Sequence, residues 1–391
     1  KPPAQQSPAQ TVDHFLSLAW KLDHITPAKI IDDSAFARRI HLDLIGRVPT
    51  AKEAADFAAQ RSRDKRSQLI DSLLASDEYP RQMREVFDCV LMTRRGAEWA
   101  DRRADQKWFA FLDDAFRRNR PWNDVVRDLI IARPERAEDR GAVWFLYERQ
   151  NNPQIIAEAL APVVFGLQVK CAQCHDHMVA REIKQAHYWG MVAAFNRSKN
   201  VDTPNGPGVS ESAIGGFTSF ANLKKESQPA LLTFFNGRKV AETWPKEGEK
   251  EIDAPELYLI PPPAKAAEPQ NQNGKGQGRR GQRAMKADQP AVPKFSRRTA
   301  FADAVTRDNP LLARAMVNRV WAMLFGRGIV HPVDLMDSKH PPTHPELLDW
   351  LAHDFEQSGY DVKRLIRTLC NTKAYQLDSK ATSKSAAPGS F

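Results

Sequence analysis

Apolar positions recur every three to four residues through most of the chain, which is the period of helices with one buried face. The pattern covers residues 11–75, continues from 82 to 133, and returns over 296–378. Within it, Trp108, Phe111, Leu112 and Phe116 form one aromatic-rich stripe. Aromatic residues at this spacing usually belong to a core, so we assign them no ligand-binding role. The pattern predicts a mainly α protein.

Helix boundaries are marked by residues that satisfy free backbone groups at helix ends. The stretch from Thr50 to Glu53 has the form of a capping box, in which side chain and backbone bond each other reciprocally. The stretch from Thr343 to Glu346 has the same form, with a proline in the first turn. We expect a helix to start at each place.

Three stretches depart from the helical pattern. Residues 200–216 are rich in Gly, Pro, Ser and Asn and are predicted to be a loop. Residues 231–240 have an Asn-Gly pair between two apolar runs, which predicts a tight β-hairpin. Residues 261–294 have no apolar period and are predicted to be a flexible or disordered linker that the fold does not need.

Composition and charge narrow the classes of protein. The chain has 391 residues with 42% hydrophobic residues, and no run of 18 apolar residues indicates a membrane span. Its net charge of +9 favours anionic partners, such as acidic polysaccharide, nucleic acid or an acidic redox protein. The basic residues are scattered except at 275–283, and no nucleic-acid-binding motif accompanies them. We therefore expect no nucleic-acid partner and a solvated basic surface.

The strongest chemical signal is the run Cys171-Ala172-Gln173-Cys174-His175, followed by Asp176 and His177. Cys-x-x-Cys-His is the attachment signature of a c-type haem, in which both thiols bond the haem and the histidine binds the iron. For this composition, the expected number of chance matches is on the order of 10⁻³. The sequence thus predicts a covalent haem held by Cys171 and Cys174, with His175 as the proximal iron ligand.

Other chemistry fits parts of this motif. Cys171, Cys174, His177 and His187 could supply four ligands to zinc. The cysteines could also form a disulfide or a redox dithiol, but a thioredoxin-like dithiol belongs in a βαβ unit, and the flanks here are helical. The remaining cysteines, Cys89 and Cys370, stand alone, and whether they pair is left open. Haem is the favoured hypothesis and zinc is the alternative.

The sixth iron ligand decides between electron transfer and ligand chemistry, because an open position suits oxygen, peroxide or substrate. His177 is too near His175 in sequence to reach the opposite haem face easily, so we expect it to line the pocket. The other candidates for the pocket or for the sixth position, from both halves of the chain, are Met178, His187, Met191, His331, His340 and His344. Met191 and His187 lie in an apolar helical stretch, where a residue of either type more often belongs to the core.

Several stretches resemble the planctomycete cytochrome C-like family, in which two domains of unknown function occur in series. The resemblance is carried by FGLQVKCAQCHDH with HYWGMVAAF, by NRVWAMLFGRG and by PPTHPELLDWL, and also by RRIHLDLIGRVPT near the N-terminus. It covers most of residues 11–378, although Met178 stands where the family commonly has proline. The resemblance implies an exported haem protein with a tie to carbohydrate degradation, and it implies no particular reaction.

Together these observations predict two helical domains with a small β-hairpin element and a disordered linker between them. The expected divisions are a disordered N-terminus (1–10), a helical c-type haem domain (11–200), a loop and small β element (201–260), the linker (261–294), a C-terminal helical domain (295–378) and a tail (379–391). Haem attachment takes place outside the cytoplasm, so we expect a periplasmic or otherwise extracytoplasmic protein whose signal peptide has been removed.

Two hypotheses about function remain. In the first, a mono-haem protein transfers electrons or oxidises a carbohydrate, with a redox partner protein or a carbohydrate as its partner. In the second, the helical domains form a scaffold that binds polysaccharide or another protein around a structural haem or zinc site. A simple electron carrier rarely needs nearly 400 residues around one haem, which favours a larger task.

Overall fold

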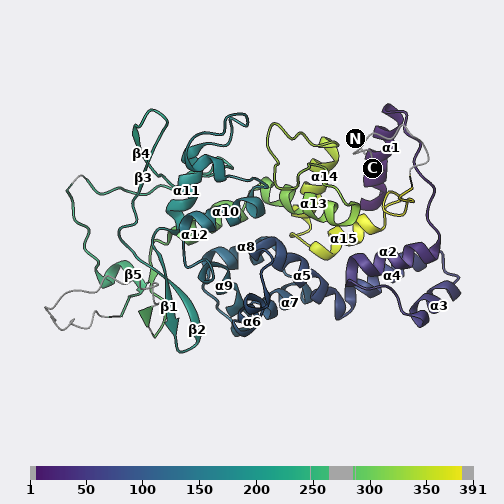
Figure 1. Cartoon of the computed structure of the whole chain (residues 1–391), viewed down its shortest axis with the longest axis horizontal. Helices are drawn as coiled ribbons and strands as arrows, with labels where there is room; N and C mark the ends of the chain where they lie inside the picture. The colour runs from purple at the N-terminus through teal and green to yellow at the C-terminus, as the bar shows by residue number, and fades with distance from the viewer. Residues whose placement is uncertain (1–5, 247, 264–284, 287, 381–391) are drawn as a thin grey trace.

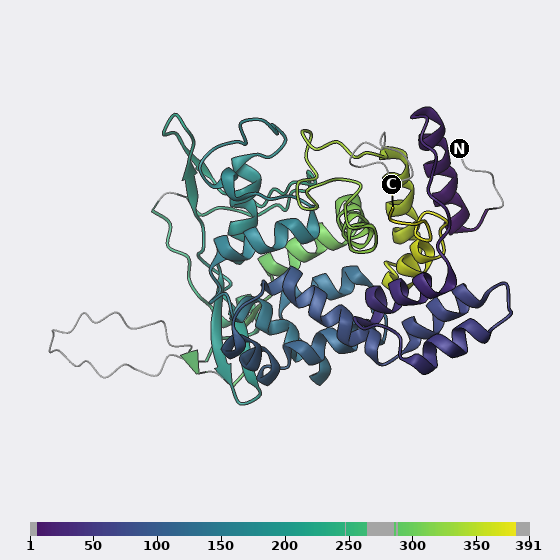
Figure 2. The same ribbon diagram turned by 45° about the vertical axis from the view of Figure 1, so that its right-hand side comes forward.

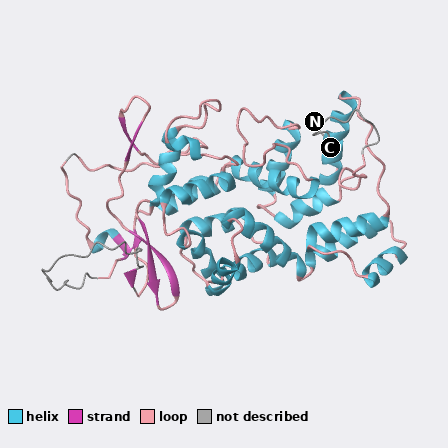
Figure 3. Cartoon of the chain, viewed as in Figure 1, coloured by secondary structure: helices cyan, strands magenta, loops and turns pink. Residues whose placement is uncertain are grey.

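The computed structural model describes residues 6–246, 248–263, 285–286 and 288–380. It is mainly helical, as predicted, and its short strands gather at one end of the molecule (Figure 3). The helices before the cysteine motif are α1 (Pro8–Leu22), α2 (Asp33–Ile45), α3 (Ala51–Ala59), α4 (Lys65–Ala75), α5 (Glu78–Met92), α6 (Ala97–Asp105), α7 (Trp108–Arg117), α8 (Trp122–Ile131), α9 (Trp144–Tyr147) and α10 (Pro153–Val164), with a 3₁₀ helix η1 (Ala137–Val143).

From the cysteine motif onward, two helices are followed by a group of short strands, and four helices complete the described chain (Figure 1). The helices are η2 (Lys170–Gln173), α11 (Gln185–Phe195), η3 (Pro255–Leu257), α12 (Arg297–Thr306), α13 (Pro310–Phe325), α14 (Pro345–Gln357) and α15 (Val362–Cys370). The strands are β1 (Ser198–Thr203), β2 (Gly206–Glu211), β3 (Ser219–Ala221), β4 (Ser227–Pro229), β5 (Tyr258–Ile260), β6 (Met285–Lys286) and β7 (Val292–Pro293).

Side-chain caps explain several helix starts, but the cap predicted for one helix is absent. Thr50 and Glu53 form the predicted capping box at α3. The predicted box at 343–346 is wrong: α14 begins after His344 without a side-chain cap. The Thr343 hydroxyl instead donates to the carbonyl oxygen of Ile329, 3.2 Å away. A tertiary contact with the preceding loop has therefore replaced the local cap.

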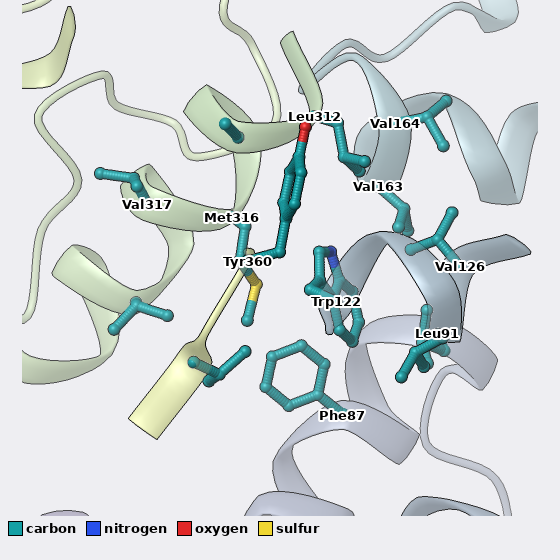
Figure 4. Packing of buried hydrophobic residues seen from close by; sticks show 14 of the residues in the cluster. Phe87, Leu91, Trp122, Val126, Val163, Val164, Leu312, Met316, Val317 and Tyr360 are labelled. Atoms are coloured by element: carbon teal, nitrogen blue, oxygen red, sulfur yellow. The ribbon is translucent and has the colours of Figure 1, made fainter. Parts of the chain in front are cut away.

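One hydrophobic core joins the N-terminal and C-terminal helices. Phe87 from α5 and Trp122 from α8 pack beside Met316 from α13 and Tyr360, which precedes α15 (Figure 4). The backbone N–H of Trp122 also donates to the carbonyl oxygen of Tyr360 (3.2 Å). Each large apolar side chain buried here contributes about 1.5–3 kcal/mol relative to exposure. The helices after residue 296 therefore share one hydrophobic core with the helices before the cysteine motif.

The C-terminal helices contact the N-terminal ones at several places along the molecule (Figure 2). Helix α12 packs on α8 and α11, α13 packs on α10, and α15 packs on α1 and α4. Beyond α15, the backbone of the chain bonds the α1–α2 connection, with the N–H of Ile31 donating to Gln376 and that of Asp378 donating to Lys29. This interleaving brings residues from both ends of the sequence together.

The β structure differs from the prediction in its extent. Residues 200–216 are not simply a loop, because β1 and β2 form an antiparallel hairpin there, with β6 parallel to β1. The predicted hairpin at 231–240 is present in a short form. The N–H of Phe234 donates to the carbonyl oxygen of Arg238 (3.0 Å), the N–H of Val240 donates to that of Leu232 (2.8 Å), and Thr233 forms a bridge with Lys239. Leu232 and Phe234 of this hairpin are buried in the core.

The predicted linker is only partly described. Residues 264–284 and 287 lie outside the described residues. At its C-terminal end, β6 pairs with β1 and β7 pairs with β5, and Ala291 is buried. These short pairings make 285–286 and 291–293 part of the fold. Among the described residues, no helix combines the length and apolar character needed to cross a membrane.

Candidate functional site

The cysteine motif lies on an exposed turn between two buried helices. After α10 the chain turns at Gly166, whose φ of +68° favours glycine, and Leu167 forms a bridge with Leu335. The short helix η2 follows, and both Cys171 and Cys174 are exposed free thiols. The fold thus presents two accessible thiols within a single turn, as covalent attachment of a prosthetic group requires.

The hydrogen bond of His175 determines which ring nitrogen can bind a metal. Its Nδ1 lies 2.7 Å from the carbonyl oxygen of Asp176. A carbonyl oxygen only accepts hydrogen bonds, so Nδ1 carries the proton and donates it. The lone pair is then on Nε2, which is the form of a neutral histidine that binds a metal through Nε2. The imidazole is therefore already in the form that a proximal iron ligand needs.

His177 has the opposite arrangement. Its Nδ1 accepts hydrogen bonds from the backbone N–H of Ala180 (2.9 Å) and of Val179 (3.3 Å). The backbone N–H of His177 donates to the carbonyl oxygen of Ile183, 2.9 Å away. With Nδ1 occupied as an acceptor, Nε2 of the neutral ring carries a proton and is a donor. His177 thus closes the loop after the motif and does not present a free metal-binding nitrogen.

Asp176 connects the motif to α11. Its carboxylate accepts hydrogen bonds from the backbone N–H of Gln185 (2.8 Å) and from Nζ of Lys184 (3.0 Å). Burial alone would raise the pKa of Asp176, but these two bonds outweigh it and lower the pKa. Because Gln185 is the first residue of α11, the carboxylate satisfies a free backbone donor at the helix start. The same residue therefore orients His175 through its backbone and α11 through its side chain.

A surface pocket of about 410 Å³ lies beside His175. The motif and the start of α11 form one wall, and the β3–β4 hairpin with its turn forms the other. Trp189 stacks on Phe220 of β3 with ring centres 6.1 Å apart, and its Nε1 donates to the carbonyl oxygen of Gln173 (3.0 Å). Leu223 in the turn of the hairpin is 79% exposed. The pocket thus has Phe220 and Leu223 on one side, while most of its other lining residues are polar or charged.

The other predicted residues near the motif are dispersed. Met178 is 81% exposed, whereas Met191 is fully buried in the core. His187 is half-buried, its ring packs edge-on against Phe235, and burial lowers its pKa. Its Nδ1 is buried without a hydrogen-bond partner among the described residues. The structure therefore favours a core role for Met191 and does not bring His187 into the pocket beside His175.

One C-terminal loop reaches the motif. The N–H of Met336 donates to the carbonyl oxygen of Gly166 (2.9 Å), next to the bridge that holds Leu167. Further along, the backbone N–H and hydroxyl of Ser338 bond the carboxylate of Glu182, at 2.6 and 3.0 Å. Glu182 belongs to the loop that follows His177. Residues 335–340 are thus tied to both sides of the motif, which no local sequence signal indicated.

His340 lies in this loop, and the other C-terminal candidates lie elsewhere. Nδ1 of His340 is 2.9 Å from Oδ1 of Asp337, so a neutral ring donates from Nδ1 and carries its lone pair on Nε2. His344 starts α14; burial lowers its pKa, and the nearest charge acting on it is that of Asp23, after α1. His331 is exposed before a cis proline. Among the three, His340 is the one whose loop is bonded to the segments on either side of the motif, at Gly166 and Glu182, although His340 does not line the pocket beside His175.

The donors proposed for zinc do not converge. Within residues 6–246, 248–263, 285–286 and 288–380, no three His, Cys, Asp or Glu side chains lie close enough together to hold a metal ion. A c-type haem places a smaller demand on the protein, because the porphyrin supplies four of the iron ligands. Two thiols and one imidazole are sufficient to hold it.

Comparison with known proteins identifies two family domains in series. Residues 11–200 match the family model PSCyt2, described as a protein of unknown function (DUF1549), and residues 297–389 match PSD1, described as a protein of unknown function (DUF1553). This pair is consistent with the planctomycete cytochrome-like family that the sequence resembles. No curated protein and no solved structure matches the chain.

Proposed function

We propose that this chain is an exported, mono-haem c-type protein that acts in redox chemistry. Cys171 and Cys174 would form the thioether bonds, and His175 would bind the iron through Nε2. Bound haem would supply one-electron transfer, or oxidation of a substrate where a coordination position is open. Because the attachment takes place outside the cytoplasm, the proposal includes an extracytoplasmic location. Its tie to carbohydrate degradation rests on the family resemblance alone.

The observation that carries this proposal is the state of His175 beside two exposed thiols. The hydrogen bond from Nδ1 to the carbonyl oxygen of Asp176 sets the tautomer before any iron is present. Asp176 is itself held by Gln185 and Lys184, so the orientation of the ring is supported by α11. The thiols need no rearrangement of the core to be reached, since both are exposed. The residues present therefore fit the group.

The zinc alternative is less well supported. The Nδ1 of His177 would have to give up the hydrogen bonds that it accepts from two backbone N–H groups. The ring of His187, in α11, packs against the ring of Phe235. A scaffold with a structural haem remains the second hypothesis, and it predicts the same attachment without a change of redox state in function.

We further propose His340 as the sixth ligand or as a pocket residue. Its loop is bonded to Glu182, and its Nε2 lone pair is free for a metal when the ring is neutral. His344 is the less favoured candidate because its surroundings include Asp23 of the N-terminal region.

The test is expression with export in a host that attaches c-type haem, followed by a denaturing gel stained for haem peroxidase activity. The wild-type chain should keep its stain after denaturation, and Cys171→Ser or Cys174→Ser should each impair attachment. Cys89→Ser is the matched control, since it removes a free cysteine outside the motif. Haem that is extracted into acidified organic solvent, or stoichiometric zinc without iron, would refute the proposal.

The sixth ligand is tested by absorption spectra of the oxidised and reduced protein, with and without cyanide. His340→Ala should change the spectrum or increase the cyanide affinity, while His344→Ala should leave both close to wild type. If His340→Ala changes neither and the protein remains folded, the ligand comes from elsewhere. A haem that undergoes no reversible change of redox state would favour the scaffold hypothesis.

A further inference from the structure

A second cavity lies between the β1–β2 hairpin and residues 253–263, and it shares no lining residue with the pocket at His175. Its volume is about 490 Å³. Its lining combines basic, acidic and flat apolar side chains: Arg197, Lys199, Val201, Ser210, Glu211, Ser212, Asp253, Pro255, Tyr258, Pro261, Pro262, Pro263 and Ala291. This size and mixture suit a small polar ligand.

Behind this cavity is a buried cluster of four arginines and two glutamates. Glu211 forms ion pairs with Arg133 and Arg298, and Glu242 pairs with Arg197 and Arg297. All six are wholly or largely buried, and the cluster carries two more positive than negative charges. Two further carboxylates are exposed and lie outside the buried cluster: that of Glu251 is bonded to the backbone N–H of Gly215, and that of Asp253 lines the cavity. Uncompensated buried charge is unfavourable, so the cluster favours a bound anion.

Arg197 is the member of the cluster that lines the cavity. Its Nε donates to the carbonyl oxygen of Gly215 (2.8 Å), and its Nη2 lies 3.1 Å from Oε1 of Glu242. Its Nη1 makes no hydrogen bond within the part of the chain that the structure describes. Burial and the neighbouring charge of Arg297 lower the pKa of Arg197. An added anion would offset both effects.

Lys199 adds a second positive charge to the same lining. It lies two residues after Arg197, which directly precedes β1, and the side chains of both residues line the cavity. Lys199 is exposed and forms no ion pair among the described residues. Glu211 also lines the cavity, but its carboxylate already accepts bonds from the cluster. Two cationic groups are therefore available to one oxyanion.

The remaining walls indicate what carries that oxyanion. Tyr258 and the prolines supply flat apolar surface, against which the C–H face of a sugar ring can stack. Asp253 accepts a hydrogen bond from the Tyr258 hydroxyl at Oδ1, 2.5 Å away. Its carboxylate would repel a second negative charge, but its other oxygen can accept from a ligand hydroxyl. The cavity therefore combines a site for an anion with an acceptor for hydroxyl groups.

We propose that this cavity binds an acidic sugar, with the carboxylate of a uronic acid at Arg197 and Lys199 and a ring hydroxyl at Asp253. This proposal does not depend on haem, because none of the residues involved belongs to the cysteine motif. It gives the chain a carbohydrate-binding site whatever its redox activity.

The test is isothermal titration calorimetry on the whole chain with glucuronate, glucose, benzoate and inorganic sulfate as separate probes. Glucuronate should bind with a dissociation constant of roughly a millimolar or tighter, and at least about tenfold more tightly than the other three. Lys199→Gln should weaken glucuronate binding about fivefold or more. The matched control is Lys29→Gln, which removes the same charge in the α1–α2 connection, at the end of the molecule opposite the strands (Figure 1).

Arg197→Gln should abolish binding, but it could also unfold the cluster, so its thermal unfolding is measured alongside. Lys199 is exposed, and its variant should remain folded in either case. Equal glucuronate affinity in Lys199→Gln and in the wild type would overturn the proposal. So would benzoate or sulfate binding as tightly as glucuronate, since the walls and Asp253 would then contribute nothing. Absence of glucuronate binding would overturn it directly.

Discussion

Glu211 offers the sharpest test of how the two matched segments are joined. Glu211 is the last residue of β2. Its carboxylate accepts hydrogen bonds from the backbone N–H of Arg297 (2.7 Å) and from the hydroxyl of Ser296 (2.7 Å), at the start of α12. It also pairs with Arg298 and Arg133, and the Glu211 side chain is completely buried. One carboxylate therefore bonds the start of a helix and pairs with two guanidinium groups. We choose Glu211→Gln because it keeps the shape and removes the charge.

The expected cost is about 3–5 kcal/mol of unfolding free energy, the usual cost of leaving a buried charge without its partner. The hydrogen bonds support the same magnitude. Hydrogen bonds to a charged group contribute about 1.5–3 kcal/mol each. Glutamine keeps only the bonds that its amide oxygen accepts, because its amide nitrogen is itself a donor and would face the donors of the cluster. Arg298 is affected most, since it is fully buried and its Nη1 has no partner among the described residues. The variant should therefore be strongly destabilised.

The assay is urea unfolding of the whole chain, followed by tryptophan fluorescence and circular dichroism. A chain of this size can unfold in more than one step, so both probes are compared before a free energy is derived. Glu249→Gln is the control: it removes an exposed carboxylate near the same sheet, and its effect should stay within about 0.5 kcal/mol. In the double variant Glu211→Gln with Arg298→Met, part of the loss should be recovered, since one charge no longer needs a partner. A loss below about 1 kcal/mol in Glu211→Gln would refute this account of the cluster.

Two further predictions concern a helix start and a close helix contact. The Arg47 guanidinium, with the Thr50 backbone N–H, holds the pKa of Glu53 well below its ordinary value. Stability from Glu53 is therefore present above the ordinary glutamate pKa of about 4.3 and is lost as the pH falls towards the folded pKa. Because the pair is partly exposed, Glu53→Gln should cost only about 1 kcal/mol at pH 7, measured by urea unfolding, and the difference from wild type should shrink at pH 3; a constant difference would contradict the assignment. In α11, a Cβ on Gly190 would lie 2.2 Å from the carbonyl oxygen of Thr233, so Gly190→Ala should lower stability by about 1–3 kcal/mol in thermal unfolding. Gly96→Ala has open space around the added methyl group and should be near neutral; equal effects of the two changes would show that the close packing is not important.

The sequence by itself determined the helical class and located the cysteine motif. Helices form from contacts three and four residues apart, so their periodicity and caps are visible locally, as at Thr50 and Glu53. Cys171, Cys174 and His175 are visible in the same way because they lie within five consecutive residues, and the haem that this motif predicts stays a prediction. The role of Asp176 had no such local sign, since the helix start that its carboxylate satisfies, at Gln185, lies nine residues further along the chain.

The tertiary structure decided the features that depend on residues far apart in the chain. The β1–β2 pairing was not predicted, because residues 200–216 are rich in Gly, Pro, Ser and Asn and have no alternating apolar pattern that would mark strands. The loop of His340 is tied to the loop that follows the motif by a bond between Ser338 and Glu182, which are 156 residues apart. Glu211 and Arg298 are separated by 87 residues. Such contacts are set by the packing of the whole core, and two charged residues in a sequence carry no sign of which partner burial will select.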